Sequence, residues 1–249
     1  MTARYDRIGS TYGEHRRPDP RVAAAIERAL GSATTVLDVG AGAGSYELGD
    51  RRYVAVEPSQ LMLAQRAPEA APVVQGVAER LPFPDDTFHA AVAILTVHHW
   101  TDAAAGLAEV RRVTRGPIVV LTWDAEQLAG TFWLVREYLP ELALQELPLV
   151  TLTAVRSLLD PCRVEPVSVP HDCTDGFFAA YWRRPERYLD PGVRAAISGL
   201  ALLDPTVVDR MVTELGDDLA SGRWHERHAD LLELDTYDHG YRLVIADGV

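Results

Sequence analysis

The sequence has only two cysteines, Cys162 and Cys173, in a chain of 249 residues. They are too few for a disulfide framework or a thiolate metal cage, so we expect two reduced thiols. No run reaches the roughly 18 apolar residues needed to cross a bilayer, and residues 1–6 lack the apolar core of a signal peptide. The sequence therefore predicts a cytoplasmic protein that does not enter a membrane.

Positive charge is also scarce, because 24 Lys and Arg stand against 36 Asp and Glu, for a formal net charge of −12. Nucleic-acid binding usually needs a positive surface, so we expect a small-molecule partner and no nucleic acid. One basic cluster, Arg183, Arg184 and Arg187, is interpreted as a solvated helix face or a contact with acidic neighbours. The oligomeric state stays open between a monomer and a homodimer.

Apolar, β-branched runs alternate with helical patterns through the first half of the chain. The predicted strands are residues 35–39, 53–56, 73–75, 90–95 and 117–122, and the predicted helices are residues 21–30, 59–67 and 103–113. Strands that are apolar throughout indicate a parallel sheet covered by helices on both faces. We therefore expect a single α/β domain.

Beyond Trp123 the order of elements changes. Helices are predicted over residues 131–138 and 153–159, a strand over 164–169, mostly helix over 177–232, and a last strand over 240–246. A structureless connection as long as residues 177–232 would be unusual in a compact domain. We interpret that stretch as a helical insertion between the last two strands.

A glycine-rich loop follows the first predicted strand. The segment Asp38-Val39-Gly40-Ala41-Gly42-Ala43-Gly44 places three glycines at alternate positions, where a chain can turn sharply and let a ligand approach its backbone. A tight turn or another kind of nucleotide site would have the same composition. The Gly-x-Gly-x-Gly spacing differs from the Gly-x-Gly-x-x-Gly of loops that cradle a pyrophosphate.

Acidic residues follow the second and third predicted strands. Glu57 stands where a carboxylate accepts both hydroxyls of a ribose, and the preceding glycine loop favours this role over that of a solvated turn residue. Pro58 and Met62 then suit one face of an adenine, although Met62 fits the core of a helix equally well. Ala78 and Glu79 suit the purine amino edge, with helix capping or a surface position as the alternative for Glu79.

Two adjacent histidines, His98 and His99, follow the fourth predicted strand, at the edge where open parallel sheets bind ligands. An imidazole there is able to act as a base near neutral pH. A structural histidine bonded to the backbone is the alternative for at least one of the pair. We expect no metal, because adjacent histidines point apart and no third ligand is apparent.

Together these motifs resemble the class I S-adenosylmethionine-dependent methyltransferases, in the group similar to ubiquinone and menaquinone C-methyltransferases (methyltransferase type 11). The resemblance extends from residue 5 to about residue 124 and rests on residues 37–44, 56–59, 78–83, 98–100 and 109–113. It implies a doubly wound, mostly parallel, Rossmann-like sheet of seven strands, whose last strand runs antiparallel between its neighbours. It also implies N-terminal lid helices over 1–30, a cofactor-binding core over 31–124, and the remaining strands with a helical, substrate-side insertion over 125–249.

The resemblance further implies S-adenosylmethionine as cofactor, S-adenosylhomocysteine as product, and roles for matched positions. The methionine moiety would lie near Asp38, Gly40, Ala41, Gly42 and Gly44, the ribose on Glu57, the adenine against Pro58, Met62, Ala78 and Glu79, and the sulfonium over Leu95. In the N-terminal segment, Tyr5, Tyr12 and Arg16 look similar to a lid that closes over the cofactor's carboxylate. Arg16 is our choice for that ion pair, with Arg17 as its rival.

The sequence defines the acceptor only as a small molecule. Phe177, Phe178, Tyr181 and Trp182, with Trp133 and Trp224, would either line an apolar pocket or, as we prefer, pack the core. No Asn-Pro-Pro-Tyr segment follows the fourth strand, which argues against methylation of adenine, cytosine or glutamine amino groups. The alternatives are an enzyme of the same fold that catalyses another reaction, a non-catalytic binding domain and, less favoured, a nicotinamide dehydrogenase.

Overall fold

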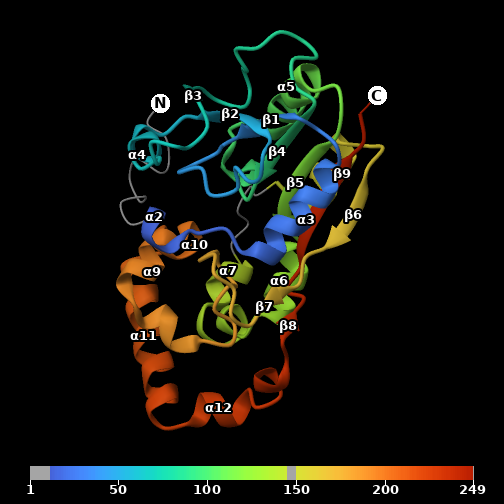
Figure 1. Cartoon of the computed structure of the whole chain (residues 1–249). Coiled ribbons are helices and arrows are strands. Elements are labelled where there is room, and N and C mark those ends of the chain that lie inside the picture. The colour runs from blue at the N-terminus through green and yellow to red at the C-terminus, as the bar shows by residue number, and fades with distance from the viewer. Residues whose placement is uncertain (1–11, 145–149, 249) are drawn as a thin grey trace.

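A seven-stranded sheet organises the computed structural model, which describes residues 12–144 and 150–248. Its strands are hydrogen-bonded in the order β3-β2-β1-β4-β5-β9-β6 (Figure 1). The strands are β1 (Thr35–Val39), β2 (Arg52–Glu57), β3 (Val73–Gln75), β4 (Ala90–Ile94), β5 (Ile118–Trp123), β6 (Arg163–Pro166) and β9 (Tyr241–Ala246). The strand order reverses between β1 and β4, and open α/β sheets bind their ligands beyond the carboxyl ends of the strands at such a point.

The last strand runs against its neighbours. Strands β1 to β5 pair in parallel, whereas β9 pairs antiparallel with β5 on one side and with β6 on the other. The register of β9 with β5 extends from Ile118 opposite Ala246 to Trp123 opposite Tyr241. The predicted fold, with its antiparallel last strand and helical C-terminal insertion, is confirmed.

Helices cover both faces of the sheet. On one face lies α3 (Pro20–Leu30), which begins with a proline and is capped by Asp19, whose carboxylate accepts from the Arg21 N–H at 2.9 Å. On the other face lie α5 (Ala103–Val113) and α8 (Leu152–Leu158). Alternate residues of β1 point to opposite faces, so Val36 packs in the α3 cluster and Leu37 in the α5 cluster.

The connection from β1 to β2 is unusual for a parallel pair. Residues 40–51 form turns and contain no helix, although parallel strands are usually joined through one. The connection from β2 to β3 contains α4 (Gln60–Ala64), and that from β4 to β5 contains η1 (Val97–His99) and α5, whereas residues 76–89 between β3 and β4 also contain no helix. The glycine loop therefore does not lead into a helix N-terminus.

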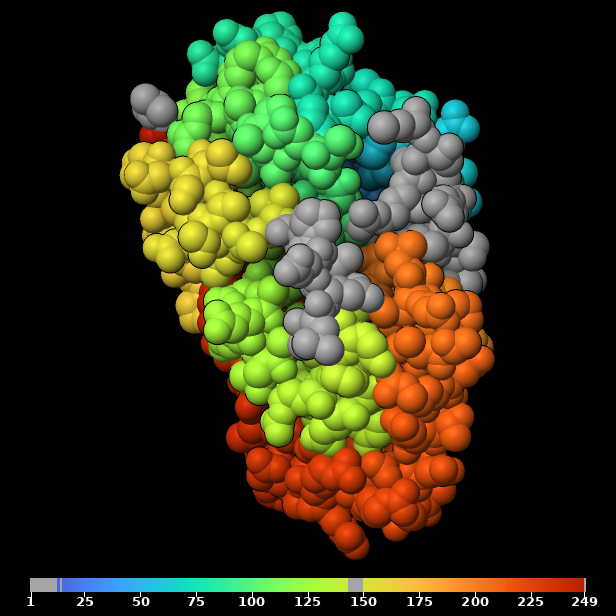
Figure 2. Space-filling view, turned by 180° about the vertical axis from the view of Figure 1, so that it is seen from behind, coloured from blue at the N-terminus to red at the C-terminus, as the bar shows by residue number. Residues whose placement is uncertain are grey.

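The second half of the chain builds a helical region below the sheet (Figures 1 and 2). Its elements are α6 (Ala125–Thr131), η2 (Leu134–Tyr138), α7 (Pro140–Leu144), η3 (Pro185–Leu189), α9 (Pro191–Ala196), α10 (Ser198–Ala201), α11 (Pro205–Ala220), α12 (Arg223–Arg227) and η4 (Leu231–Glu233), with α2 (Tyr12–His15) beside α9. The strand predicted over residues 164–169 is in fact two. β6 ends at Pro166, the Val167 N–H still donates to the Tyr241 carbonyl of β9 at 2.9 Å, and β7 (Val169–Pro170) then pairs with β8 (Thr236–Tyr237).

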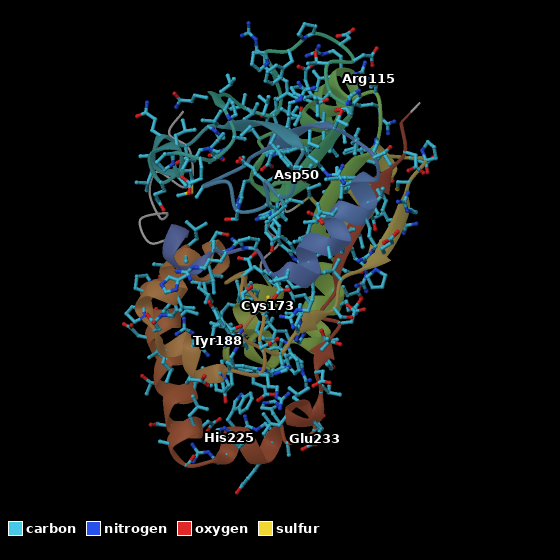
Figure 3. The ribbon with its side chains drawn as sticks, viewed as in Figure 1. Asp50, Arg115, Cys173, Tyr188, His225 and Glu233 are labelled. Atoms are coloured by element: carbon cyan, nitrogen blue, oxygen red, sulfur yellow. The ribbon has the colours of Figure 1, made fainter. Side chains whose placement is uncertain are left out.

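The aromatic residues of this region fill its core. Trp133, Trp182 and Trp224 are at most 1% exposed, and the indole of Trp133 donates to the Trp182 carbonyl at 2.7 Å. Tyr188, labelled in Figure 3, is also completely buried. Of the predicted pocket aromatics only Phe178 is half-buried, so core packing is the better description of the cluster.

The basic cluster is engaged within the fold. Arg183 donates to the Leu234 carbonyl at 2.9 Å, Arg184 donates to the Cys173 carbonyl at 2.6 Å, and Arg187 lies over the Tyr181 ring. These arginines therefore contact carbonyl oxygens and a ring, and the charge of Arg187 also interacts with that of its acidic neighbour Asp190. In the part of the chain that the structure describes, no helix is long and apolar enough to cross a membrane.

Candidate functional site

Three strand ends bring the predicted site residues to one edge of the sheet. Val39 of β1 lies opposite Val56 of β2, and Asp38 lies opposite Val92 of β4. Since these strands are parallel, the glycine loop after β1, Glu57 at the end of β2 and the segment after β4 all emerge at the carboxyl edge. This edge is where a doubly wound sheet binds its ligand.

The carboxylate of Glu57 is bonded to the glycine loop. The Gly42 N–H donates to Glu57 Oε2 at 2.9 Å, and the Ser59 N–H donates to Oε1 at 2.8 Å. Glu57 is 4% exposed, so these bonds hold its charge where water reaches little.

The loop adopts backbone conformations that suit glycine. Gly40, Gly42 and Gly44 have φ values of 73°, 54° and 89°, in the region that L side chains rarely adopt. A Cβ on Gly40 would also lie 2.0 Å from the hydroxyl oxygen of Thr96, which follows β4. The loop and the end of β4 are therefore in direct contact.

A buried carboxyl group, Asp38, lies directly before the loop and is 3% exposed. Burial raises the pKa of Asp38 to about 8; Glu47 and Glu57 add to the rise, and Arg66 opposes it. The carboxyl is therefore mostly protonated at neutral pH. A cation placed beside it would favour the ionised form.

The end of β4 carries backbone strain. Leu95 has φ 53°, in the left-handed region that is unfavourable for a residue with a Cβ, and it is half-buried. Such outliers persist where the surrounding structure enforces them and are found preferentially at ligand sites. Leu95 lies beside Thr96 at the edge where the sulfonium was predicted.

The two histidines lie in η1, and both are half-buried. The expectation that they point apart is wrong, because their ring centroids are 3.7 Å apart. The His98 ring also lies 4.5 Å from that of Trp123, at the end of β5. Among residues 12–144 and 150–248, no three His, Cys, Asp or Glu side chains gather as a metal site.

On the predicted adenine side, the residues have differing environments. Pro58 is exposed, Met62 is 1% exposed, and Ala78 packs near Gly106 of α5. Glu79 Oε1 accepts from the Thr101 and Asp102 N–H groups at 2.7 and 3.0 Å, immediately before α5. Glu79 therefore has the helix-capping role that was its alternative to binding adenine. Both of these bonds are made by Oε1.

The N-terminal segment is tied to the C-terminal half. Arg16, predicted to pair with a cofactor carboxylate, forms an ion pair with Asp175 at 2.6 Å, and both side chains are buried. Tyr46 donates to the other Asp175 oxygen at 2.9 Å, and the Arg16 carbonyl accepts from Ser45 at the end of the glycine loop. Arg16 therefore has a protein carboxylate beside it, and its pairing with a cofactor stays a prediction.

The structure does not describe the side chains of two residues that we expect in the lid. Tyr5 and the side chain of Tyr12 lie outside the described residues, while the rival Arg17 is exposed. Sequence reasoning also missed three site-adjacent charges: Asp175, Glu47 and Arg66. No sequence signal pointed to them, because their partners lie 19 or 159 residues away in the chain.

The comparisons with known proteins agree with this geometry. Residues 37–117 match the family described as a methyltransferase domain. A solved structure from Anabaena variabilis, described as a candidate methyltransferase of an antibiotic biosynthesis pathway, is 34% identical with a TM-score of 0.85. The similarity covers 93% of this chain and 98% of that one.

Curated relatives match over a shorter length. The methyltransferase YcgJ of Bacillus subtilis is 33% identical over 43% of this chain, and a demethylmenaquinone methyltransferase of Mycolicibacterium paratuberculosis is 36% identical over 44%. The chain spans half or less of these two relatives, 42% and 50%. The [4+2]-cyclase SpnF, 18% identical with a TM-score of 0.55, shares the fold alone.

Membership of a family follows from the near-complete match to the Anabaena structure, the matching domain family and the geometry of the sheet edge. The methyl donor of that family is S-adenosylmethionine. The chain belongs to the class I S-adenosylmethionine-dependent methyltransferases.

Proposed function

We propose that the chain transfers the methyl group of S-adenosylmethionine to an oxygen, nitrogen or carbon atom of a small molecule. The observation that carries the proposal is the bond between the Gly42 N–H and the Glu57 carboxylate, which joins the glycine loop to the end of β2. It brings a backbone that a ligand can approach closely and an acceptor for ribose hydroxyls to one place.

The residues at this edge fit the cofactor. We assign its ribose to the Glu57 carboxylate and its methionine ammonium to the vicinity of Asp38. The rest of the methionine moiety would lie along Gly40, Ala41, Gly42 and Gly44. Pro58, Met62, Ala78 and Glu79 are proposed for the adenine, Leu95 for the sulfonium, and Tyr12 and Arg16 for the closing segment.

The same edge is a poor fit for a dinucleotide. A pyrophosphate is usually held by the N–H groups and the dipole at the N-terminus of the helix after the glycine loop. Residues 40–51 contain no helix, so that anion site is missing. This observation favours S-adenosylmethionine over a nicotinamide cofactor.

The proposed mechanism depends mainly on positioning. S-adenosylmethionine supplies a methyl group on a charged sulfonium, so an in-line displacement needs little assistance for the leaving group. Leu95 has a strained backbone, and the neighbouring Thr96 lies directly against Gly40. We propose that this segment forms the surface on which the methyl donor and the acceptor are positioned. For an acceptor that loses a proton, we propose His98 or His99 as the base.

A small acceptor is supported by the names of relatives and by the residues near the histidines. Those names include demethylmenaquinone methyltransferase and a candidate enzyme of antibiotic biosynthesis. The half-buried Trp123 ring against His98 offers an apolar surface to a ring-containing substrate. A cytoplasmic location and the absence of nucleic-acid binding remain predictions.

The test is calorimetric titration of the wild type and of Glu57→Ala with S-adenosylmethionine. Loss of two charge-assisted bonds to ribose should weaken binding by about a hundredfold or more. Glu69→Ala, which removes an exposed carboxylate, is the control and should bind as the wild type does. Equal affinity in both variants would contradict the assignment of Glu57.

The histidines need a separate assay, with an acceptor found by screening. In at least one of His98→Asn and His99→Asn, kcat should fall about a hundredfold or more while the affinity for S-adenosylmethionine stays unchanged. If kcat is unchanged in both variants, neither histidine is the base, and the positioning of donor and acceptor alone accounts for catalysis.

A further inference from the structure

The glycine loop lacks the helix that usually follows such a loop. In the Rossmann arrangement, that helix packs on the sheet and fixes the loop through its first turn. Here residues 40–51 form only turns before β2 begins at Arg52; Asp50, near the end of this connection, is labelled in Figure 3. Another feature must therefore hold the loop in shape.

The side chains of Glu57 and Arg66 bind the backbone N–H and the carbonyl of Gly42. Its N–H donates to Glu57 Oε2 at 2.9 Å, and its carbonyl accepts from Arg66 Nη1 at 3.3 Å. Gly42 is also in the left-handed region, with φ 54°. The middle glycine of the loop is thus held from both sides.

Arg66 is itself fixed by a closed network. It forms an ion pair with Glu47, and both side chains are 5% exposed. Arg66 Nη2 also donates to the Ala71 carbonyl at 3.0 Å, while the Ala71 N–H donates to Glu47 Oε2 at 2.8 Å. The planar guanidinium therefore joins the loop, the turn after it and the segment before β3.

Stability alone does not explain why this ion pair is buried. Removing two charges from water is costly, and apolar side chains of similar size often stabilise a fold as well or better. The fork of an arginine, however, fixes the relative positions of the groups that it bonds. The groups fixed here include the backbone that the cofactor would touch.

We propose that Arg66, held by Glu47, is a positioning residue that keeps the glycine loop in its cofactor-binding shape, in place of the missing helix. The inference rests on the proposed binding of S-adenosylmethionine at this loop. It adds to that site two residues, Arg66 and Glu47, that do not contact the cofactor.

The test uses the double variant Arg66→Met/Glu47→Gln, because removing Arg66 alone would strand a buried carboxylate and risk unfolding. Arg51→Met is the matched control. Arg51 lies in the same connection, at its far end, and donates to the carbonyls of Gly31 and Ala33. Both variants lose carbonyl contacts, and only the double variant loses contact with the loop.

Each protein is titrated with S-adenosylmethionine by calorimetry, and amide hydrogen exchange is measured without cofactor. The double variant should bind about tenfold more weakly, the loss expected for one charged bond to the loop. Its exchange should accelerate in residues 40–48 while α3 is unaffected. Arg51→Met should keep the affinity of the wild type even if its melting temperature falls.

Wild-type affinity and unchanged exchange of the loop in the double variant would overturn the inference. An equal loss of affinity in Arg51→Met would do the same, because a general loss of stability would then explain both results. If the wild type itself does not bind S-adenosylmethionine, the proposed function fails instead, and the exchange data alone decide whether Arg66 shapes the loop.

Discussion

Neutralising Asp38 should stabilise the folded protein, and the gain should grow with pH. Burial raises the pKa of Asp38 from 3.8 to about 8 in the folded state. Between these values the unfolded chain has lost this proton and the folded chain retains it. Since the unfolded state binds fewer protons, the free energy of unfolding falls as the pH rises through this window.

The size of the effect follows from the shift. Each pH unit inside the window changes the free energy of unfolding by about 1.4 kcal/mol. From pH 5 to pH 8 the contribution of Asp38 should therefore change by at most about 4 kcal/mol. In Asp38→Asn the side chain does not titrate, so the stability of the variant relative to the wild type should rise by that amount.

The assay is urea unfolding of both proteins at several pH values from 5 to 8, analysed as a difference so that the titration of other groups cancels. Asp50→Asn, which removes an exposed carboxylate from the same connection, is the control and should show a flat difference. A flat difference for Asp38→Asn as well would refute the reasoning, because the carboxyl would then ionise alike in both states.

The same carboxyl should report the arrival of the cofactor. If the methionine ammonium lies beside Asp38, as proposed, its charge favours the ionised form, and binding at pH 7 should release about one proton. Calorimetric titration in buffers of different ionisation enthalpy measures this number. A binding enthalpy that does not depend on the buffer would place the ammonium elsewhere.

Two further substitutions test contacts at the site. In thermal unfolding, Gly40→Ala should lower the free energy of unfolding by about 2 kcal/mol more than Gly31→Ala does. Both positions have a positive φ, but only at Gly40 would the added Cβ collide with Thr96. Equal losses of stability would contradict this contact. Asp175→Asn, which removes the carboxylate charge from the buried ion pair with Arg16, should cost about 3 kcal/mol in urea unfolding, whereas Asp172→Asn at an exposed pair should cost less than about 1 kcal/mol. Similar losses would show that the buried pair contributes little.

The sheet was predictable because its strands are buried on both faces. Runs such as residues 36–39 and 118–121 are short and rich in Val, Ile and Leu without polar alternation, which indicates strands of a covered parallel sheet, and Gly40 after the first and Gly116 before the second argue against a helix. The limits of α5 were predicted correctly, since Asp102 caps its start and apolar residues recur at helical spacing. The split of residues 164–169 into two strands was not, because it depends on where the chain exchanges β9 for β8 as its partner, between Val167 and Val169.

The candidate site was predictable where chemistry follows a strand closely in sequence. Asp38, the glycines and Glu57 each lie within a few residues of a strand end, and the structure gathers them at one edge. The charges that surround them were not predictable. The partners of Arg66 and Arg16 lie far away in the chain and meet them only through the fold, so no spacing in the sequence marks them.

The most direct test of the central claim is calorimetric titration of the purified wild-type protein with S-adenosylmethionine and, separately, with NAD. The geometry of the glycine loop and Glu57 predicts micromolar binding of S-adenosylmethionine and none of NAD. Binding of NAD, or no binding of S-adenosylmethionine, would contradict the account of this site and leave only the fold.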